Sequence, residues 1–99
     1  MNPMDDLLNH LLNAPKREVK MVYIATFRLP TFKPGEANGR DYITIARRDT
    51  RAEAQAALDA SIAENSIGTV LMREGRKLHQ YTQAGVYLGH WVISAQEAV

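Results

Sequence analysis

The chain has 99 residues, of which 45% are hydrophobic and 23% charged, and it contains no cysteine. This length and composition are typical of one globular domain with a small core, and they exclude disordered and low-complexity classes. The lack of cysteine excludes disulfide bridges, thiolate metal ligands and a cysteine nucleophile. No apolar run reaches the roughly 18 residues of a membrane span. Asp5 and Asp6 precede the first leucines, which is the wrong charge for a signal peptide, so we expect a cytoplasmic protein without a membrane partner.

The net charge of +1 hides an uneven distribution along the chain. Residues 16–51 contain nine lysine and arginine residues against four acidic residues, a net charge of +5, whereas residues 1–15 and 52–66 are acidic. A concentrated basic segment is typical of surfaces that bind nucleic acid or acidic proteins.

Residues 1–15 predict a short amphipathic helix that is an appendage to the domain. Pro3 stands at the first helical position, and acidic residues follow where the helix dipole favours them. The apolar residues then fall at helical spacing: Met4, Leu7, Leu8, Leu11 and Leu12. A helix of about three turns is not stable alone. Its apolar stripe therefore packs on its own domain, on a second copy in a homodimer, or on a partner.

Residues 19–95 predict a single α+β domain that begins with two strands. The first is expected from Met21 to Leu29 and the second from Asp41 to Arg48, on either side of a long basic loop that contains an Asn-Gly turn signal at residues 38–39. Regular alternation in the second strand places Ile43 and Ile45 on one side. Its other side is expected to carry Tyr42, Thr44 and Ala46.

A helix is expected directly after the second strand. Thr50-Arg51-Ala52-Glu53 matches the capping box, in which the threonine and glutamate side chains satisfy free backbone donors at a helix start. A narrow stripe of mostly small residues follows at helical spacing: Ala54, Ala57, Leu58, Ser61 and Ile62. Asn65 is expected to end the helix in the left-handed conformation.

From Ile67 onward the pattern predicts three strands, with turns at Glu74-Gly75 and Ala84-Gly85. The strands are expected at Thr69–Arg73, Arg76–Thr82 and Val86–Ile93. The resulting order, helix-β-β-helix-β-β-β, predicts an antiparallel sheet of about five strands with one helix packed across a face.

Two-residue turns would fix which residues of the last three strands share a face of the sheet. One face would carry Leu71, Leu78 and Trp91. The other would carry Val70, Met72, Tyr81, Leu88 and Val92. Because both sets are partly apolar, the pattern leaves open which face the helix covers, and the uncovered face is a candidate binding surface.

The same register sets His79 opposite His90, a geometry in which two imidazoles are able to hold a metal. A slip of one residue would separate the pair, and surface or packed histidines are far more common. The sequence also lacks a nucleophile elbow, a Walker loop and a Gly-x-Gly-x-x-Gly motif. We therefore expect a protein that is not an enzyme and needs no metal or cofactor.

Molecular recognition is the role that the charge pattern favours. The planar guanidinium of arginine binds phosphate or carboxylate groups in a bidentate manner, and aromatic rings add stacking surface. The predicted partner-binding residues are Lys33, Arg40, Arg47, Arg48, Arg51, Tyr81, Tyr87 and Trp91. The alternative is that the charged residues form a solvated rim and the aromatic ones are half-buried.

Residues 21–93 resemble the small phage-encoded anti-CRISPR proteins, in particular a type I-F inhibitor. The resemblance rests on Val22-Tyr23-Ile24, on the strand and alanine-rich helix of Ile43–Ala63, and on the strand Ile67–Arg73. It implies a non-enzymatic inhibitor in the cytoplasm of an infected bacterial host. Such an inhibitor binds subunits of a type I CRISPR surveillance complex and blocks recognition of target DNA.

The strands followed by a Thr-Arg-Ala-Glu-Ala helix also resemble the arm-type DNA-binding domains of phage integrases. The three strands after the helix depart from that family. This second resemblance implies a small module that binds DNA or RNA.

Overall fold

A computed structural model describes residues 19–35 and 40–98 of the chain. It confirms the α+β class and the five-stranded antiparallel sheet. The elements are β1 (Met21–Arg28), β2 (Tyr42–Arg48), α2 (Arg51–Asn65), β3 (Thr69–Glu74), β4 (Lys77–Thr82) and β5 (Tyr87–Glu97). The helix predicted at residues 1–15 and the Asn-Gly turn at residues 38–39 lie outside the described residues. No helix in the described part of the chain is long and apolar enough to cross a membrane.

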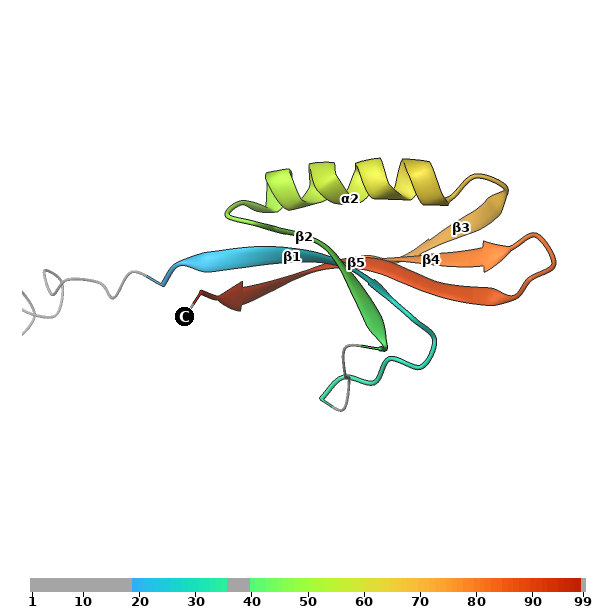
Figure 1. Cartoon of the computed structure of the whole chain (residues 1–99), viewed down its shortest axis with the longest axis horizontal. Helices are drawn as coiled ribbons and strands as arrows, with labels where there is room; N and C mark the ends of the chain where they lie inside the picture. Colours follow the sequence, from blue (N-terminus) through green and yellow to red (C-terminus); the bar gives the residue numbers. More distant parts are fainter. Residues whose placement is uncertain (1–18, 36–39, 99) are drawn as a thin grey trace, which may run out of the picture.

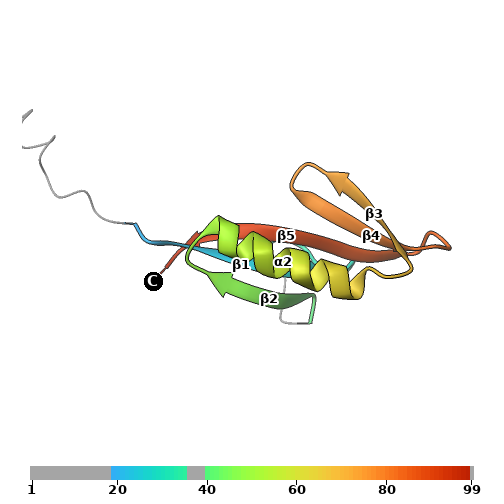
Figure 2. The same cartoon turned by 90° about the horizontal axis from the view of Figure 1, so that it is seen from above.

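The strands follow the order β2-β1-β5-β4-β3 across the sheet, and α2 lies on one face (Figure 1). The β1–β2 hairpin comes first, and α2 then carries the chain to the opposite edge, from which β3, β4 and β5 return until β5 pairs with β1. The helix packs on β2, β1 and β5. Seen from above, the β3–β4 hairpin extends sideways beyond the helix (Figure 2). Strands β3 and β4 therefore have no helix packed along them in the described part of the chain.

The start of α2 agrees with the predicted capping signal. The Glu53 backbone N–H donates to Thr50 Oγ1 at 3.2 Å. The Thr50 hydroxyl in turn donates to Glu53 Oε1 at 2.8 Å, whereas the capping box expects that carboxylate to accept from the Thr50 backbone. The predicted stripe faces the sheet, with Ala54 and Leu58 buried. Small side chains at this interface let the helix lie close to the strands.

The predicted left-handed stop at Asn65 is wrong. Asn65 is the last helical residue, and Ser66 follows it with φ −102°. The left-handed conformation occurs at Gly68, with φ +76°. Glycine adopts it without the steric cost of a Cβ atom, and the Asn65 amide instead donates to the Ser61 carbonyl at 2.8 Å.

The core lies between α2 and the sheet face that carries Leu71, Leu78 and Trp91, which answers the question that the sequence left open. Its buried residues are Ala25, Ala46, Leu58 and Trp91. The Trp91 ring packs against Phe27 with a centroid distance of 4.6 Å.

Two β-bulges overturn details of the predicted faces. The register between β1 and β2 shifts at Ala25/Thr26, which turns Ala46 into the core opposite Ala25 instead of alongside Tyr42. The register between β4 and β5 shifts at Gln80/Tyr81, and Leu88 lines a hollow with Trp91 on the helix side, not the side of Val92. One extra residue in a strand reverses the orientation of the side chains beyond it.

Candidate functional site

The face of the sheet opposite α2 is the candidate functional surface, which we call the open face. The chain between β1 and β2 descends on this side of the sheet (Figure 1). Strand pairing sets one side chain from each of four strands in a row across this face: Arg28, His90, His79 and Met72. The open face contains two chemically different regions. One is a groove that extends from the Arg28 end of this row toward β2. The other is a cluster around the two histidines of the row.

The groove has a volume of about 410 Å³ and lies over β2, β1 and β5. Its lining residues are Ile24, Thr26, Arg28, Phe32, Tyr42, Thr44, Arg47, Ser94 and Gln96. They bring two guanidinium groups, two aromatic rings, four hydroxyls and one amide to one concavity. None of these described lining residues is acidic, so the groove favours an anionic ligand.

Arg28 and the two aromatic residues of the groove form a stacked arrangement. The Arg28 Cζ atom lies 4.4 Å from the centroid of the Phe32 ring, and the Phe32 and Tyr42 rings meet edge to face at 6.2 Å. Backbone hydrogen bonds hold Phe32 in place, because its N–H donates to the Leu29 carbonyl at 2.9 Å. Burial lowers the pKa of Arg28, whose guanidinium is thus partly stripped of water before any ligand arrives.

Arg47 and Arg48 are neighbours in the chain and lie on opposite faces of the sheet. Arg47 pairs with Ile24 and lines the groove. Arg48 pairs with Tyr23 on the helix side, where the Arg51 guanidinium lies 5.1 Å from the centroid of the Tyr23 ring. The alternation of a β-strand therefore assigns only the first of the two arginines to the groove.

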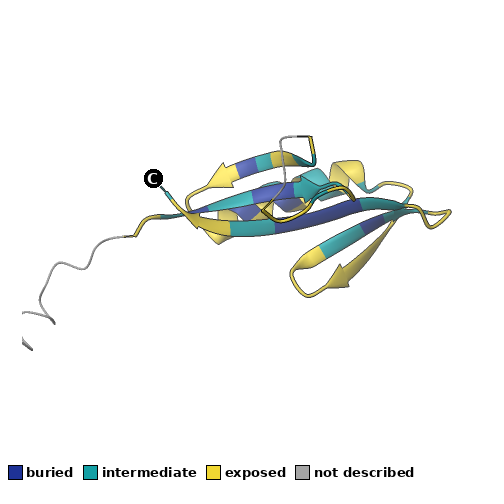
Figure 3. Ribbon diagram, turned by 90° about the horizontal axis from the view of Figure 1, so that it is seen from below, coloured by how far each residue is buried: buried dark blue, intermediate teal, exposed yellow. Residues whose placement is uncertain are grey.

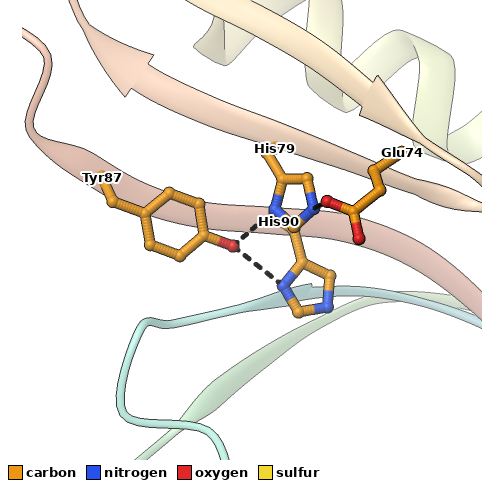
Figure 4. Close-up of polar contacts among 4 residues, drawn as sticks. All are labelled: Glu74, His79, Tyr87 and His90. Carbon is orange, nitrogen blue, oxygen red and sulfur yellow. Dashed lines mark hydrogen bonds and ion pairs between the residues drawn. The ribbon is translucent and has the colours of Figure 1, made fainter.

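The second region of the open face is a cluster of Glu74, His79, Tyr87 and His90 (Figure 4). The Tyr87 hydroxyl lies 2.7 Å from His79 Nδ1 and 3.2 Å from His90 Nδ1. Because a hydroxyl has a single hydrogen, it donates to one imidazole and accepts from the other, which assigns opposite tautomers to the two rings. The Glu74 carboxylate lies 3.4 Å from His79 Nε2 without making a hydrogen bond to it, and its negative charge favours a hydrogen on that atom. Tyr87 then donates to His79 and accepts from His90.

This assignment leaves His90 Nε2 as a buried lone pair. The atom has no hydrogen-bond partner among the described residues. Burial lowers the pKa of His90 to about 4, and the positive charges of Lys77 and Arg28 and the neighbouring His79 add to the effect. His90 is therefore neutral at neutral pH, and the Tyr87 hydroxyl links its imidazole in β5 to that of His79 in β4.

The predicted pairing of His79 with His90 is confirmed, with ring centroids 5.4 Å apart. Both Nδ1 atoms are turned toward the Tyr87 hydroxyl and are held by it (Figure 4). Within the described residues, no group of three or more His, Asp or Glu side chains is placed to hold a metal ion.

The structure disperses the eight predicted partner-binding residues. Lys33 and Arg40 are exposed on the chain between β1 and β2, and Arg47 lines the groove. Arg51 lines a separate hollow of about 220 Å³ on the helix side, together with Arg73 and Arg76.

The predicted aromatic residues lie elsewhere. Tyr87 belongs to the histidine cluster of the open face, and the Tyr81 ring lies beside it with a centroid distance of 5.2 Å. Trp91 is only 4% exposed and belongs to the core. The sequence reasoning missed Arg28 as a site residue. The signal was present, because Arg28 shares the alternation of Ile24 and Thr26 along β1.

Comparison with protein-family models, with curated proteins and with solved structures found no match for this chain. The proposal that follows therefore rests on the chemistry of the open face.

Proposed function

We propose that the protein is a non-catalytic binding module that holds a segment of single-stranded nucleic acid in the groove of its open face. One observation carries the proposal: Arg28 and Arg47 line the same groove as Phe32 and Tyr42. Single-stranded nucleic acid presents both partners that these groups bind, an anionic backbone and flat bases.

Most of the lining groups have a counterpart on such a ligand. The two guanidinium groups suit phosphate oxygens, for which arginine is a bidentate donor. The Arg28–Phe32 stack and the Tyr42 ring offer a platform for a base. The hydroxyls of Thr44 and Ser94 and the Gln96 amide supply hydrogen-bonding groups along the groove. The volume of about 410 Å³ lies within the range of about 300–1,000 Å³ that is usual for small-ligand pockets.

The shape of the site favours a single strand over a duplex. Reading a duplex through its major groove requires an element that protrudes from the protein, such as a helix or a β-ribbon. A concave groove instead receives bases that are splayed away from their neighbours, as single-stranded loops and ends allow.

The groove also supports a role in binding rather than catalysis. Its hydroxyls have no carboxylate or imidazole beside them among the lining residues to act as a general base. His90, the buried base of the open face, is not among the residues that line the groove.

The role as an inhibitor of a type I CRISPR surveillance complex stays a prediction from the resemblance. A groove for single strands suits a protein that acts beside guide and target nucleic acid. Co-purification of the chain with a type I complex tests this role, and binding to free oligonucleotides without any such association would contradict it.

The neighbouring arginines of β2 provide a matched test of the groove. Fluorescence anisotropy with a short labelled single-stranded oligonucleotide would measure affinity as a function of salt. We expect Arg47→Ala to weaken binding by about tenfold and to reduce the salt slope by about 0.7, the value for one phosphate contact on a single strand.

Arg48→Ala removes the same charge from the adjacent position on the opposite face, so it controls for net charge. It is expected to retain nearly the affinity of the unmodified protein. An equal loss of affinity in both variants would show that binding depends on general charge and not on the groove. Tighter binding of a duplex than of the single strand would also contradict the proposal.

A further inference from the structure

Strand β3 is an edge of the sheet that the described structure leaves uncovered on both faces. It pairs only with β4, and α2 packs on the other half of the sheet. Three consecutive apolar residues in it are exposed: Val70 by 44%, Leu71 by 37% and Met72 by 58%. In Figure 3 almost the whole strand has the colour of exposed residues. Such an edge presents unpaired backbone donors and acceptors beside apolar side chains, which is a template for another strand.

The opposite edge of the same sheet is protected. Strand β2 contains a bulge in its pairing with β1, ends in Arg47 and Arg48, and packs against α2. Bulges, charged residues and a covering helix are the usual means by which proteins prevent edge pairing. In the middle of β3, at Val70 to Met72, none of these features is present. The contrast indicates that the β3 edge is an interaction surface.

We propose that the partner at this edge is the β3 strand of a second copy of this chain, which pairs antiparallel about a two-fold axis through Leu71. In this register Leu71 lies opposite Leu71 of the second copy. Val70 and Met72 lie opposite each other on both sides of the axis, and Thr69 lies opposite Arg73. Apolar side chains thus meet apolar ones on both faces, and polar ones meet polar ones, as cross-strand stabilisation requires.

Other registers are less favourable for the same strand. A shift of two residues centres the axis on Met72 and sets Leu71 against Arg73 and Val70 against Glu74. A shift of one residue would place the helix-side residues of one copy against the open-face residues of the other. The strand is therefore complementary to itself in one register, which favours a second copy over an unrelated strand.

The charges at the two ends of the paired β3 strands also support a second copy of the chain as the partner. In the antiparallel arrangement, the β3–β4 turn of one copy lies beside the start of β3 in the other copy. Arg76 in this turn and Lys77 directly after it are basic. That start follows directly on the C-terminal end of α2, whose last turn has Glu64 and no basic residue. The negative end of the helix dipole and this carboxylate complement the basic turn. The turn would also cover Ile67, which is 85% exposed.

A cysteine introduced at the axis provides a direct test, because the natural chain has no cysteine. Residues directly opposite in an antiparallel pair have Cα atoms about 4.5–5.5 Å apart, within the range of about 4.4–6.8 Å that a disulfide spans. Under mild oxidation we expect Leu71→Cys to form a disulfide-linked dimer at least tenfold faster than two single-cysteine controls.

The first control, Met72→Cys, lies in the same strand but does not meet itself in the proposed register. The second, Val86→Cys, is exposed in the β4–β5 turn. Faster crosslinking of Met72→Cys would overturn the register. Equal rates for all three variants would overturn the pairing of the β3 edges.

Sedimentation of the full chain supplies a measurement that needs no cysteine. We expect a dimer whose fraction rises with protein concentration and disappears in Leu71→Lys, with the circular dichroism of the fold retained. The paired substitutions Leu8→Ala and Leu11→Ala are expected to leave the dimer intact. A strictly monomeric natural chain, or a dimer that survives Leu71→Lys and is lost on substitution of the N-terminal leucines, would contradict the proposal.

Discussion

Gly89 in β5 lies against the end of β1. Its φ of +133° is rare for residues with a side chain, and a Cβ atom built there would clash with the Arg28 carbonyl oxygen and lie 2.8 Å from Phe27 Cζ. Arg28 lines the groove and Phe27 packs on Trp91, so this contact joins the groove to the core. A glycine is required here by conformation and by space together.

Gly89→Ala is therefore expected to lower the free energy of unfolding by about 2–4 kcal/mol, from the backbone strain and the clash combined. Denaturant unfolding measured by the fluorescence of the single tryptophan would give this value. Gly85→Ala is the matched control, because Gly85 also has a positive φ, +90°, but open space around it. It should lose only the conformational part, about 1–2 kcal/mol. Equal losses would contradict the close approach of β5 and β1.

His90 predicts how the stability of the domain depends on pH. Its pKa in the folded protein is about 4, below the ordinary value of 6.5. Between these values the unfolded chain binds a proton that the folded protein does not, so stability is complete above pH 6.5 and falls as the pH drops toward 4. We expect the loss from this group to be on the order of 1–3 kcal/mol.

The free energy of unfolding would be measured between pH 7.5 and 4, a range that runs from above the ordinary pKa of 6.5 down to the folded value of about 4. Comparing the natural protein with His90→Gln separates this effect from the titration of other groups. The variant is expected to have the shallower dependence. A steeper dependence in the variant would show that His90 is not held neutral by the groups that face it, which are Lys77, Arg28, His79 and Tyr87.

Among the elements, β5, β4, β3 and α2 meet at the buried side chain of Gln80. Gln80 Oε1 accepts from Trp91 Nε1 at 2.8 Å. Its amide donates to the Asn65 carbonyl at 2.9 Å and to Thr69 Oγ1 at 3.0 Å. The Gln80 side chain thus makes hydrogen bonds to the Trp91 indole in the core, to the backbone at the end of α2 and to the first residue of β3.

Gln80→Ala should cost about 2–4 kcal/mol of stability, because it opens a cavity and leaves the buried Trp91 N–H without an acceptor. Thermal or denaturant unfolding would measure the change. Gln83→Ala, at an exposed position after β4, is expected to stay within about 0.5 kcal/mol. A Gln80 variant as stable as the Gln83 variant would show that this network does not join the elements.

The existence of the elements could be predicted from sequence because their signals are local. The Thr50–Glu53 cap, the small-residue stripe of the helix and the Gly75 turn each depend on residues close together in the chain. The two bulges could not be predicted in this way, since they arise from pairing between strands. They account for the wrong faces assigned to Ala46 and Leu88.

At the scale of the whole molecule, the sheet has two different faces and two different edges. One face holds the core under α2, and the open face presents the groove and the histidine cluster. One edge is protected and the other is not. In the proposed dimer both helices lie on the same side of a continuous sheet, so both open faces point the same way and both grooves are available to one extended strand of nucleic acid.

The candidate site was only partly predictable from the sequence. Charge clustering pointed to the segment that contains Arg47, which lines the groove, but a run of arginines does not reveal which members share a face. Trp91 was assigned to binding because an aromatic residue in an alternating strand has the same pattern whether it faces a helix or solvent. Its ring is buried because α2 lies on that face of the sheet, and the strand pattern does not show which face the helix covers.

Binding of single-stranded nucleic acid to the open face is tested most directly by an NMR titration. Adding a short single-stranded oligonucleotide to the labelled full chain should shift the backbone amide signals of groove residues such as Thr26, Thr44 and Ser94. The signals of the exposed side of α2, including Gln55 and Asp59, should remain in place. Shifts concentrated on α2, or no shifts on the open face at ligand excess and low salt, would contradict the claim.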